Sequence, residues 1–235
     1  MSTGQINKYL CTSMKRLPIK TDDGSYSLHL PEWNESYHSK HGAVQEAYHV
    51  FIRNGLDLFD DCSSIRLLEM GFGTGLNCMI TFLESLRRDL LVDYTGVEAY
   101  PVESSVISKL DHVKALNANL HAKVMETMHG SSWEKFVDIH DGFRLYKTNQ
   151  RFEDLQLDDK FHLIYFDAFG ARVQPELWTA EIFAKMFDFT LPGGVLVTYA
   201  AKGSVRRAML EVGYEVEKLP GPPGKREMLR ARRRE

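Results

Sequence analysis

The chain has 235 residues, of which 43% are hydrophobic and 26% charged, and its formal net charge at pH 7 is -3. These figures fit one globular domain with a core of useful size, or one such domain with a modest extension. They exclude a globally basic protein that binds nucleic acid through its overall charge. The end of the chain, 225–235, is locally basic, and it is either a solvated end or a surface for phosphates.

The three cysteines are Cys11, Cys62 and Cys78. Their odd number, without metal-like pairing, argues against a disulfide framework or a zinc site. Apolar runs stay well short of the roughly 18 residues that a membrane span needs. The first twenty residues are polar and lack the apolar stretch of a signal peptide. We therefore expect a cytoplasmic protein with no metal and no membrane partner.

The first sixty residues predict an N-terminal extension ahead of the main domain. Turn residues around Gly24, placed between alternating apolar positions, indicate a small hairpin over 19–33. Apolar residues at helical spacing indicate a helix over 42–58. We expect residues 1–60 to pack, as a hairpin and a helix, on a domain formed by residues 61–235.

From residue 61 onward, the pattern alternates between strands and helices. The predicted strands cover 65–70, 93–98, 143–147, 161–166, 195–199, 214–219 and 227–231, and the predicted helices cover 76–88, 102–118, 179–189 and 204–212. This alternation predicts an α/β fold with a mostly parallel sheet of seven strands and helices on both faces. In such sheets ligands bind beyond the carboxyl ends of the strands, near the switch in strand order.

A glycine-rich turn follows the first of these long strands. Gly71, Gly73 and Gly75 have no Cβ, so the backbone can turn sharply and a ligand can lie against it. Their spacing, G-x-G-x-G, differs from the dinucleotide fingerprint G-x-G-x-x-G. The preceding Glu69 would repel a pyrophosphate but could meet a cation or hydroxyls. This favours S-adenosylmethionine, which carries a sulfonium and an ammonium and no phosphate, over a dinucleotide; a purely structural turn is the alternative.

Three of the predicted strands end in a carboxylate, at Glu69, Glu98 and Asp167. Glu98 lies 23 positions after Gly75 (98 − 75), close to the spacing of about 20 at which an acidic residue accepts hydrogen bonds from ribose hydroxyls. Asp167 ends a fully apolar strand, where a carboxylate is costly to bury without partners. We expect it to face either a substrate nitrogen or the ammonium of the cofactor.

Two further positions each allow two interpretations. Asp154 lies between the third and fourth strands, where a carboxylate could accept a hydrogen bond from an adenine amino group. The adjacent Glu153 leaves the register open, and a solvated acidic pair is the alternative. Trp178 follows a turn and could stack on a base, or it could be a core residue.

Several motifs of this chain resemble one family. The residues that carry the likeness are 35–43, 49–52, 68–77, 166–169 with 175–179, 194–203 and 220–228. They are similar to the methyltransferase domain of the bacterial tRNA 5-methylaminomethyl-2-thiouridine biosynthesis enzymes, the MnmC/MnmD type. The likeness runs from about residue 17 to residue 231. The glycine-rich run together with Pro-Gly-Pro-Pro-Gly-Lys-Arg is its most specific part.

The resemblance implies a Rossmann-like class I fold with S-adenosylmethionine as methyl donor and S-adenosylhomocysteine as product. The implied acceptor is the amine of 5-aminomethyl-2-thiouridine at the wobble position of tRNA, which becomes 5-methylaminomethyl-2-thiouridine. Bifunctional relatives add a flavin-dependent oxidase domain; this chain ends before one, so we expect a stand-alone form without flavin. The alternatives are a methyltransferase that acts on a small-molecule amine and a non-catalytic relative that binds RNA.

The resemblance and the residues together predict the site. Asp167 is expected to be catalytic. The expected cofactor-binding residues are Tyr37, Gln45, Glu69, Gly71, Gly73, Gly75, Asn77, Glu98 and Asp154, and the expected substrate-binding residues are Phe169, Trp178, Tyr199 and Lys202. In one place the chain departs from the family pattern. Gly170, Ala171 and Arg172 stand where relatives often have a proline, which puts the shape of the acceptor loop in doubt.

Overall fold

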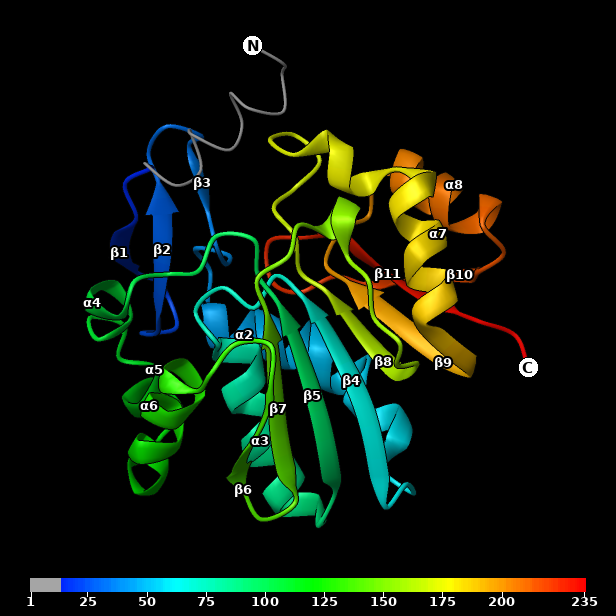
Figure 1. Ribbon diagram of the computed structural model, residues 1–235. Helices are drawn as coiled ribbons and strands as arrows, with labels where there is room; N and C mark the ends of the chain where they lie inside the picture. Colours follow the sequence, from blue (N-terminus) through cyan, green and yellow to red (C-terminus); the bar gives the residue numbers. More distant parts are fainter. Residues whose placement is uncertain (1–13) are drawn as a thin grey trace.

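The computed structural model describes residues 14–235, so the expectations that concern residues 1–13, including Cys11, lie outside the described residues. The main sheet is built from β4 (Ser64–Met70), β5 (Leu91–Val97), β6 (Phe136–His140), β7 (Phe143–Thr148), β8 (Phe161–Phe166), β9 (Thr190–Thr198), β10 (Glu215–Pro220) and β11 (Glu227–Arg232). Their order across the sheet is β10-β11-β9-β8-β4-β5-β7-β6 (Figure 1).

Five neighbouring strands of this sheet, from β9 to β7, are parallel, and their carboxyl ends point toward the top of Figure 1. Strand β11 runs antiparallel to β9, and β6 runs antiparallel to β7 at the opposite edge. The α/β class is therefore as predicted, but the sheet has eight strands instead of seven. Strand β6 was missed because it is an edge strand with a largely exposed face, and its register shifts between Asp138 and His140.

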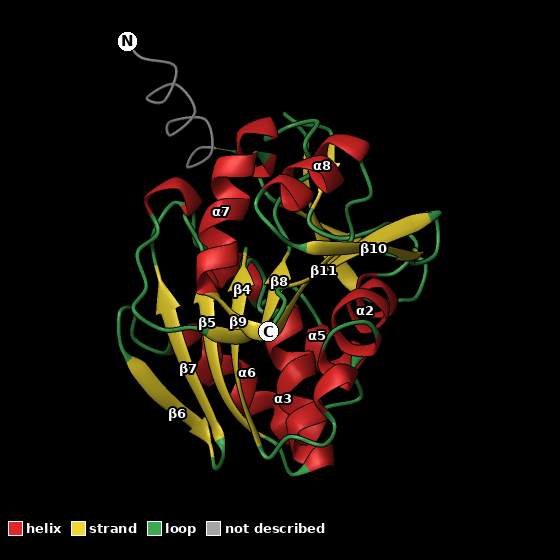
Figure 2. Ribbon diagram, turned by 90° about the vertical axis from the view of Figure 1, so that its right-hand side faces the viewer, coloured by secondary structure: helices red, strands yellow, loops and turns green. Residues whose placement is uncertain are grey.

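Alternate residues of the central strands face two separate cores. On β4, Leu67 packs with residues of α3 (Leu76–Arg88), whereas Leu68 packs with residues of α7 (Ala180–Phe189) and α8 (Gly203–Glu211). The period of two in a strand produces this division. Figure 2 shows α3 along one side of the strands. Because both faces are covered, the strands read as continuous apolar runs, which is why they were easy to predict.

The N-terminal part forms a second, three-stranded sheet of β1 (Leu17–Lys20), β2 (Tyr26–Leu30) and β3 (Glu35–Ser36). The single helix expected over 42–58 is instead α2 (Ala43–Ala47), a π-helix η1 (Tyr48–Arg53) and a 3₁₀-helix η2 (Leu56–Phe59). The break falls at Gly55, which packs so closely that an added Cβ would lie 2.5 Å from the Phe51 carbonyl oxygen.

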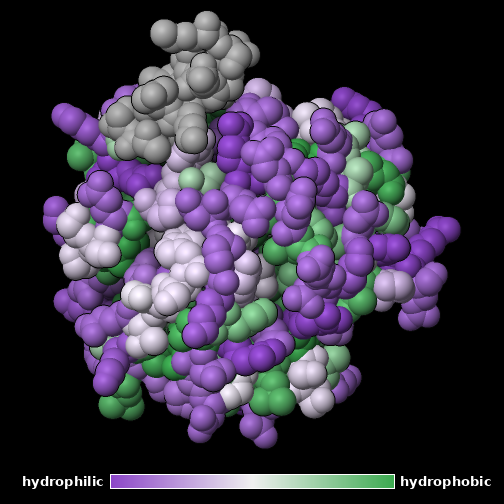
Figure 3. Space-filling view, viewed as in Figure 1, coloured by the Kyte–Doolittle hydropathy of each residue, from purple (hydrophilic) through white to green (hydrophobic). Residues whose placement is uncertain are grey.

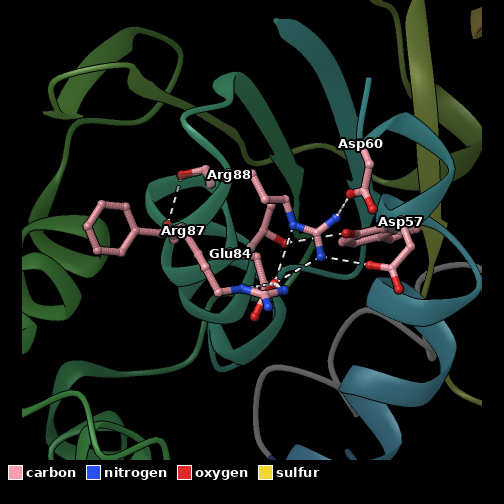
Figure 4. Close-up of polar contacts among 9 residues, drawn as sticks. Asp57, Asp60, Glu84, Arg87 and Arg88 are labelled. Atoms are coloured by element: carbon pink, nitrogen blue, oxygen red, sulfur yellow. Dashed lines mark hydrogen bonds and ion pairs between the residues drawn. The ribbon is translucent and has the colours of Figure 1, made fainter. Parts of the chain in front are cut away.

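An ion-pair network joins this N-terminal part to the main domain (Figure 4). The Arg88 guanidinium on α3 donates to Asp57 Oδ1 at 2.7 Å, to Glu84 Oε2 at 2.9 Å and to Asp60. The Arg88 side chain is 11% exposed, so water screens these pairs less than it would on an open surface. The network holds η2 against α3.

The helix expected over 102–118 is also interrupted. The structure has α4 (Ser104–Ile107), α5 (His112–Ala115), a 3₁₀ turn η3 (Asn119–His121) and a further helix, α6 (Ala122–Gly130). Asn117 has a φ of 53°, a left-handed conformation that ends the helical path after α5. The 3₁₀ turns η4 (Phe152–Asp154) and η5 (Pro175–Trp178) complete the described elements.

Hydrophilic side chains dominate the face shown in Figure 3, where apolar side chains form small separate groups. Among residues 14–235, no helix has the length and apolar character that crossing a membrane requires. Of the two cysteines in this range, Cys62 is exposed and Cys78 is buried, and both are free thiols.

Candidate active site

A cavity of about 350 Å³ opens where β4 and β8 end. The chain continues from β4 to β5 on one side of this point and places β8 on the other side, so the strand order reverses here. Gly71 follows β4 and Asp167 follows β8, and both residues line the cavity. The cavity therefore lies at the switch point, where open α/β sheets bind their ligands.

The glycine turn forms one wall of the cavity. Gly71 has a φ of 98°, and an added Cβ would lie 2.6 Å from the Asp167 carbonyl oxygen. Gly73 has a φ of 50°, and its Cβ would lie 3.2 Å from the Tyr37 ring. Residues with side chains are strained in both conformations, and glycine lets Asp167 and Tyr37 pack closely against the turn. Gly75 is also left-handed, but it packs under His129 and does not line the cavity.

Glu98 is held at the cavity by backbone groups. The Gly73 amide donates to Glu98 Oε2 at 2.9 Å, and the Tyr100 amide donates to Glu98 Oε1 at 2.9 Å. Glu98 follows β5, so its carboxylate links the ends of two neighbouring strands. Each carboxylate oxygen has lone pairs left for a ligand hydroxyl.

A chain of buried hydrogen bonds runs beneath the cavity to Asp167. The Tyr94 hydroxyl donates to Glu69 Oε2 at 2.8 Å, and Asn77 Nδ2 donates to Glu69 Oε1 and to Asp167 Oδ2, both at 2.9 Å. One amide thus bridges two carboxyl groups. Burial raises the pKa of Glu69 well above its usual range, whereas the hydrogen bonds from Tyr94 and Asn77 act in the opposite direction.

Burial also raises the pKa of Asp167, to about 7, with the charge of Glu46 adding to the rise. The hydrogen bond from Asn77 and the charge of Lys225 act in the opposite direction. A carboxyl group with this pKa exchanges its proton close to neutral pH, as a general base requires. Asp167 is therefore the residue of the cavity with the clearest capacity for acid–base chemistry.

Aromatic side chains form another part of the cavity wall. The Phe169 ring packs edge-on against Trp33, with centroids 5.6 Å apart, and against Tyr37, with centroids 4.9 Å apart. The Tyr199 hydroxyl donates to the Ala168 carbonyl oxygen at 2.8 Å, which fixes its ring beside Asp167. Rings held in this way present flat faces on which a planar ligand can stack.

A lysine from the end of the chain reaches the same wall. Lys225 Nζ lies 3.8 Å from the centroid of the Tyr199 ring and forms an ion pair with Glu46 on α2. The other oxygen of Glu46 accepts a hydrogen bond from the Ser39 amide at 2.7 Å. Sequence reasoning missed both Glu46 and Lys225. Lys225 belongs to the Pro-Gly-Pro-Pro-Gly-Lys-Arg motif, but a motif does not show which side chain contacts a distant helix.

Six predicted site residues do not line the cavity: Gln45, Glu69, Gly75, Asp154, Trp178 and Lys202. Gln45 is exposed beside a separate shallow pocket, and its backbone amide donates to Asp23 Oδ2 at 3.1 Å. Glu69 is fully buried under Asn77. Asp154 is exposed, and its neighbour Glu153 lines the cavity in its place.

Trp178 and Lys202 lie outside the cavity for different reasons. Trp178 is 5% exposed and packs in the core on Phe166 and Phe183, and its indole N–H donates to the Phe169 carbonyl oxygen at 2.8 Å. It supports the aromatic wall from behind. Lys202 is exposed at the N-terminus of α8. The remaining predicted residues, Tyr37, Gly71, Gly73, Asn77, Glu98, Asp167, Phe169 and Tyr199, all line one cavity.

The arginines near the end of the chain make bonds within the fold. Arg230 pairs with Glu217 at 2.7 Å, and Arg234 pairs with Glu215. Arg232 and Arg233 donate to backbone carbonyl groups. Their charges are therefore partly committed to holding β11 and the residues after it in place, which makes this segment a weaker surface for phosphates than its composition suggested.

A Rossmann-like sheet with a glycine-walled cavity at its switch point defines an α/β protein that binds a nucleoside-type ligand. The family model described as S-adenosyl-L-methionine-dependent methyltransferase matches residues 113–234. The chain therefore belongs to the S-adenosyl-L-methionine-dependent methyltransferase family.

Two curated relatives carry the name tRNA 5-methylaminomethyl-2-thiouridine biosynthesis bifunctional protein MnmC. The one from Ectopseudomonas mendocina is 29% identical over 218 residues, which cover 84% of this chain and 32% of the relative. The one from Pseudomonas putida is 27% identical over 242 residues, which cover 94% and 35%. The chain spans about a third of the length of these relatives.

The fold is similar to the crystal structure of MnmC2 from Aquifex aeolicus. The TM-score is 0.73 at 21% sequence identity, and the match covers 98% of this chain and 77% of that one. This likeness confirms the predicted methyltransferase fold.

The residues of the cavity fit S-adenosylmethionine. Two buried polar atoms, Thr74 Oγ1 and Asn77 Oδ1, have no hydrogen-bond partner among the described residues, although both side chains line the cavity. A buried acceptor without a partner is costly, and a cationic ligand group would satisfy it. In residues 14–235, no group of three or more histidine, cysteine or acidic side chains could hold a metal ion.

Proposed function

We propose that this chain transfers a methyl group from S-adenosylmethionine to the amine of 5-aminomethyl-2-thiouridine at the wobble position of tRNA. The observation that carries the proposal is the shared cavity. Its lining combines a glycine turn and Glu98 with a group of aromatic side chains and Asp167. The names of the similar proteins, about a third of whose length this chain spans, support the choice of acceptor.

We assign the half of the cavity next to the glycine turn to the donor and call it the donor half; it comprises Gly71, Gly73, Thr74, Asn77 and Glu98. The Glu98 carboxylate would accept hydrogen bonds from the ribose hydroxyls. The free oxygens of Thr74 and Asn77 would accept from the ammonium of the methionine part. No phosphate is needed for this fit, and the carboxylate of Glu98 would disfavour one.

We assign the other half to the acceptor and call it the acceptor half; it comprises Tyr37, Phe169, Tyr199, Lys225 and Asp167. Aromatic rings bind unstacked bases of single-stranded RNA loops, and the wobble base is such a base. A pyrimidine against this wall would carry its aminomethyl group toward Asp167. Because the formal net charge of the protein is -3, we expect tRNA affinity to depend on local cations such as Lys202, Arg206 and Arg207.

Methyl transfer requires a neutral amine whose lone pair points at the methyl carbon. When bound, S-adenosylmethionine supplies an electrophilic methyl group; the new carbon–nitrogen bond forms as the carbon–sulfur bond breaks, leaving S-adenosylhomocysteine. Asp167 orients the amine and receives the proton that the nitrogen loses. Asn77 holds the carboxylate of Asp167 in place at 2.9 Å, and the walls of the cavity keep the two reactants aligned.

The experiment compares two tRNA preparations as methyl acceptors, one that carries 5-aminomethyl-2-thiouridine and one already methylated at that amine. With labelled S-adenosylmethionine, only the first should accept the label, and mass analysis should find one added methyl group on the wobble uridine. Equal labelling of both preparations, or transfer only to free small amines, would overturn the proposed acceptor.

A further inference from the structure

We propose that Lys225 determines acceptor specificity: it neutralises Glu46, which lies beside the acceptor half, so that Asp167 offers its negative charge to the amine without a second charged carboxylate of Glu46. The cavity thereby accepts an amine carried on a neutral ring and disfavours oligocationic amines. This inference rests on the proposed function for the identity of the acceptor, but its electrostatic part concerns the cavity alone.

Geometry places all three charges at the same wall. Glu46, Lys225 and Asp167 line the cavity together with Tyr199. Lys225 lies over the Tyr199 ring at 3.8 Å from its centroid, and its ammonium pairs with Glu46. The Glu46 side chain is 9% exposed and that of Lys225 is 32% exposed, so solvent does not fully screen either charge.

The pair changes what the cavity offers to a ligand. Glu46 without Lys225 would be a buried carboxylate beside a second carboxylate, and two such groups attract cations strongly. Asp167 responds to both members, because the charge of Glu46 raises its pKa and that of Lys225 lowers it. Another acidic residue of the wall, Glu35, is paired with Arg172 at 2.9 Å. Lys225 therefore leaves Asp167 as the carboxylate that meets the amine.

The Lys225–Glu46 pair also links the turn after β10 to α2. The test must therefore distinguish the effect of the lysine charge from the effect of this structural link. The end of β10 and the turn that follows it touch the N-terminal part at two further places. His49 Nε2 lies 2.8 Å from the Pro220 carbonyl oxygen, and Gly224 packs against His41 so closely that an added Cβ would lie 2.3 Å from the ring. Neither contact involves the side chain of Lys225 or Glu46, so we expect both to remain when the Lys225–Glu46 pair is removed.

The test measures spermidine binding to the complex of the protein with S-adenosylhomocysteine, by calorimetry and without tRNA. Lys225→Met should bind spermidine about tenfold more tightly than the wild type, because one carboxylate is unmasked. Lys225→Met combined with Glu46→Gln should return to within about twofold of the wild type. A purely mechanical role predicts that the double variant behaves like Lys225→Met, since both variants lack the Lys225–Glu46 link.

Two further variants complete the test. Lys218→Met removes a lysine of the same hairpin that pairs with Glu227 at 2.9 Å outside the cavity, and it should leave spermidine binding unchanged. Glu46→Gln alone should weaken spermidine binding, which keeps the proposal testable if Lys225→Met does not fold. Unchanged spermidine affinity in Lys225→Met, or equal tightening in the double variant, would overturn it.

The proposed function is tested separately with the same variants. Turnover of the hypomodified tRNA should fall about tenfold in Lys225→Met and recover in the double variant. If the wild type does not methylate this tRNA at all, the proposed function fails, while the spermidine measurements still decide whether Lys225 masks Glu46.

Discussion

The donor half and the acceptor half of the cavity are assembled from the chain in different ways. The donor half comes from two consecutive strand ends, and its residues lie within 71–98. The acceptor half combines residues from the N-terminal part, from the ends of β8 and β9 and from the segment before β11, at positions as distant as 37 and 225. A local motif can specify the first, whereas the second exists only once the whole domain has folded.

We expect the largest effect from a substitution in the donor half. Gly71→Val would place its Cβ 2.6 Å from the Asp167 carbonyl oxygen on a backbone with a φ of 98°, so the turn must move and the donor site closes. We expect donor affinity to fall about a hundredfold or more, which corresponds to roughly 3 kcal/mol. Equilibrium dialysis with labelled S-adenosylmethionine measures it.

A matched glycine variant controls for this change. Gly130→Ala adds a Cβ that meets nothing within 4 Å, and it should leave donor affinity within about twofold. Donor affinity that survives Gly71→Val would mean that the glycine turn does not contact the donor.

The next effect concerns the acceptor half. Asp167→Asn should lower methyl transfer about a hundredfold or more while donor affinity changes little, because the amide cannot receive a proton. For the wild type, the rate should rise with pH through about 7, since the protonated carboxyl group below that pH cannot act as a base. Single-turnover rates between pH 5.5 and 8.5, on the order of ten values, define this profile. Full turnover in Asp167→Asn would remove Asp167 from the mechanism.

A smaller effect tests the hydrogen bond from Asn77 in the donor half to Asp167 in the acceptor half. Asn77→Ala removes the hydrogen bond that lowers the pKa of Asp167, so the rising limb of the pH profile should move to higher pH. We expect a rate loss of about tenfold at neutral pH. Tyr94→Phe is the control, because it removes a hydrogen bond to Glu69 and leaves the contact between Asn77 and Asp167 intact. If the rising limb of the pH profile shifted equally in both variants, the shift would reflect a general disturbance of the buried hydrogen-bond chain and not the loss of the bond between Asn77 and Asp167.

A further expected effect is on stability and not on activity, and it lies outside the cavity lining. Burial lowers the pKa of His112 to about 3, and neither ring nitrogen has a hydrogen-bond partner among the described residues. Because the unfolded chain binds a proton at pH values below 6.5, the stability that the neutral ring contributes is present above that pH and is lost as the pH falls toward 3. The slope is at most about 1.4 kcal/mol per pH unit for this one group.

His112→Leu should therefore flatten the fall in Tm between about pH 6.5 and about pH 4.5. His38 and His129, each with a pKa lowered to about 4, continue to titrate in this window, so part of the slope remains. The exposed His140→Leu should not change the slope. An unaltered slope in His112→Leu would show that His112 is not buried in its neutral form.

The difference between the two halves also explains what the sequence could predict. The buried strands and the glycine turn follow from local patterns, and so do the positions of Glu98 and Asp167 at strand ends. The position of the Glu69 side chain could not be predicted from local patterns, because this carboxylate could turn toward the cavity or into the core. The hydroxyl of Tyr94 on the next strand holds it in the core. Tertiary partners also decide the cases of Trp178 and Gln45.

The acceptor half shows the limit of local reasoning most clearly. Lys225 and Glu46 are 179 positions apart, and no spacing rule relates them. Their contact depends on how α2 and the segment before β11 pack at the end of the sheet. The edge strand β6 was missed for a related reason, since its pairing with β7, and not its own composition, makes it a strand.

The central claim is that the cavity at the switch point binds a sulfur-containing nucleoside and no pyrophosphate. Calorimetric titration of the wild-type protein with S-adenosylhomocysteine, and separately with NAD, tests this most directly. The account predicts one saturable site for S-adenosylhomocysteine and no measurable heat with NAD. Saturable binding of NAD, or none of S-adenosylhomocysteine, would contradict it.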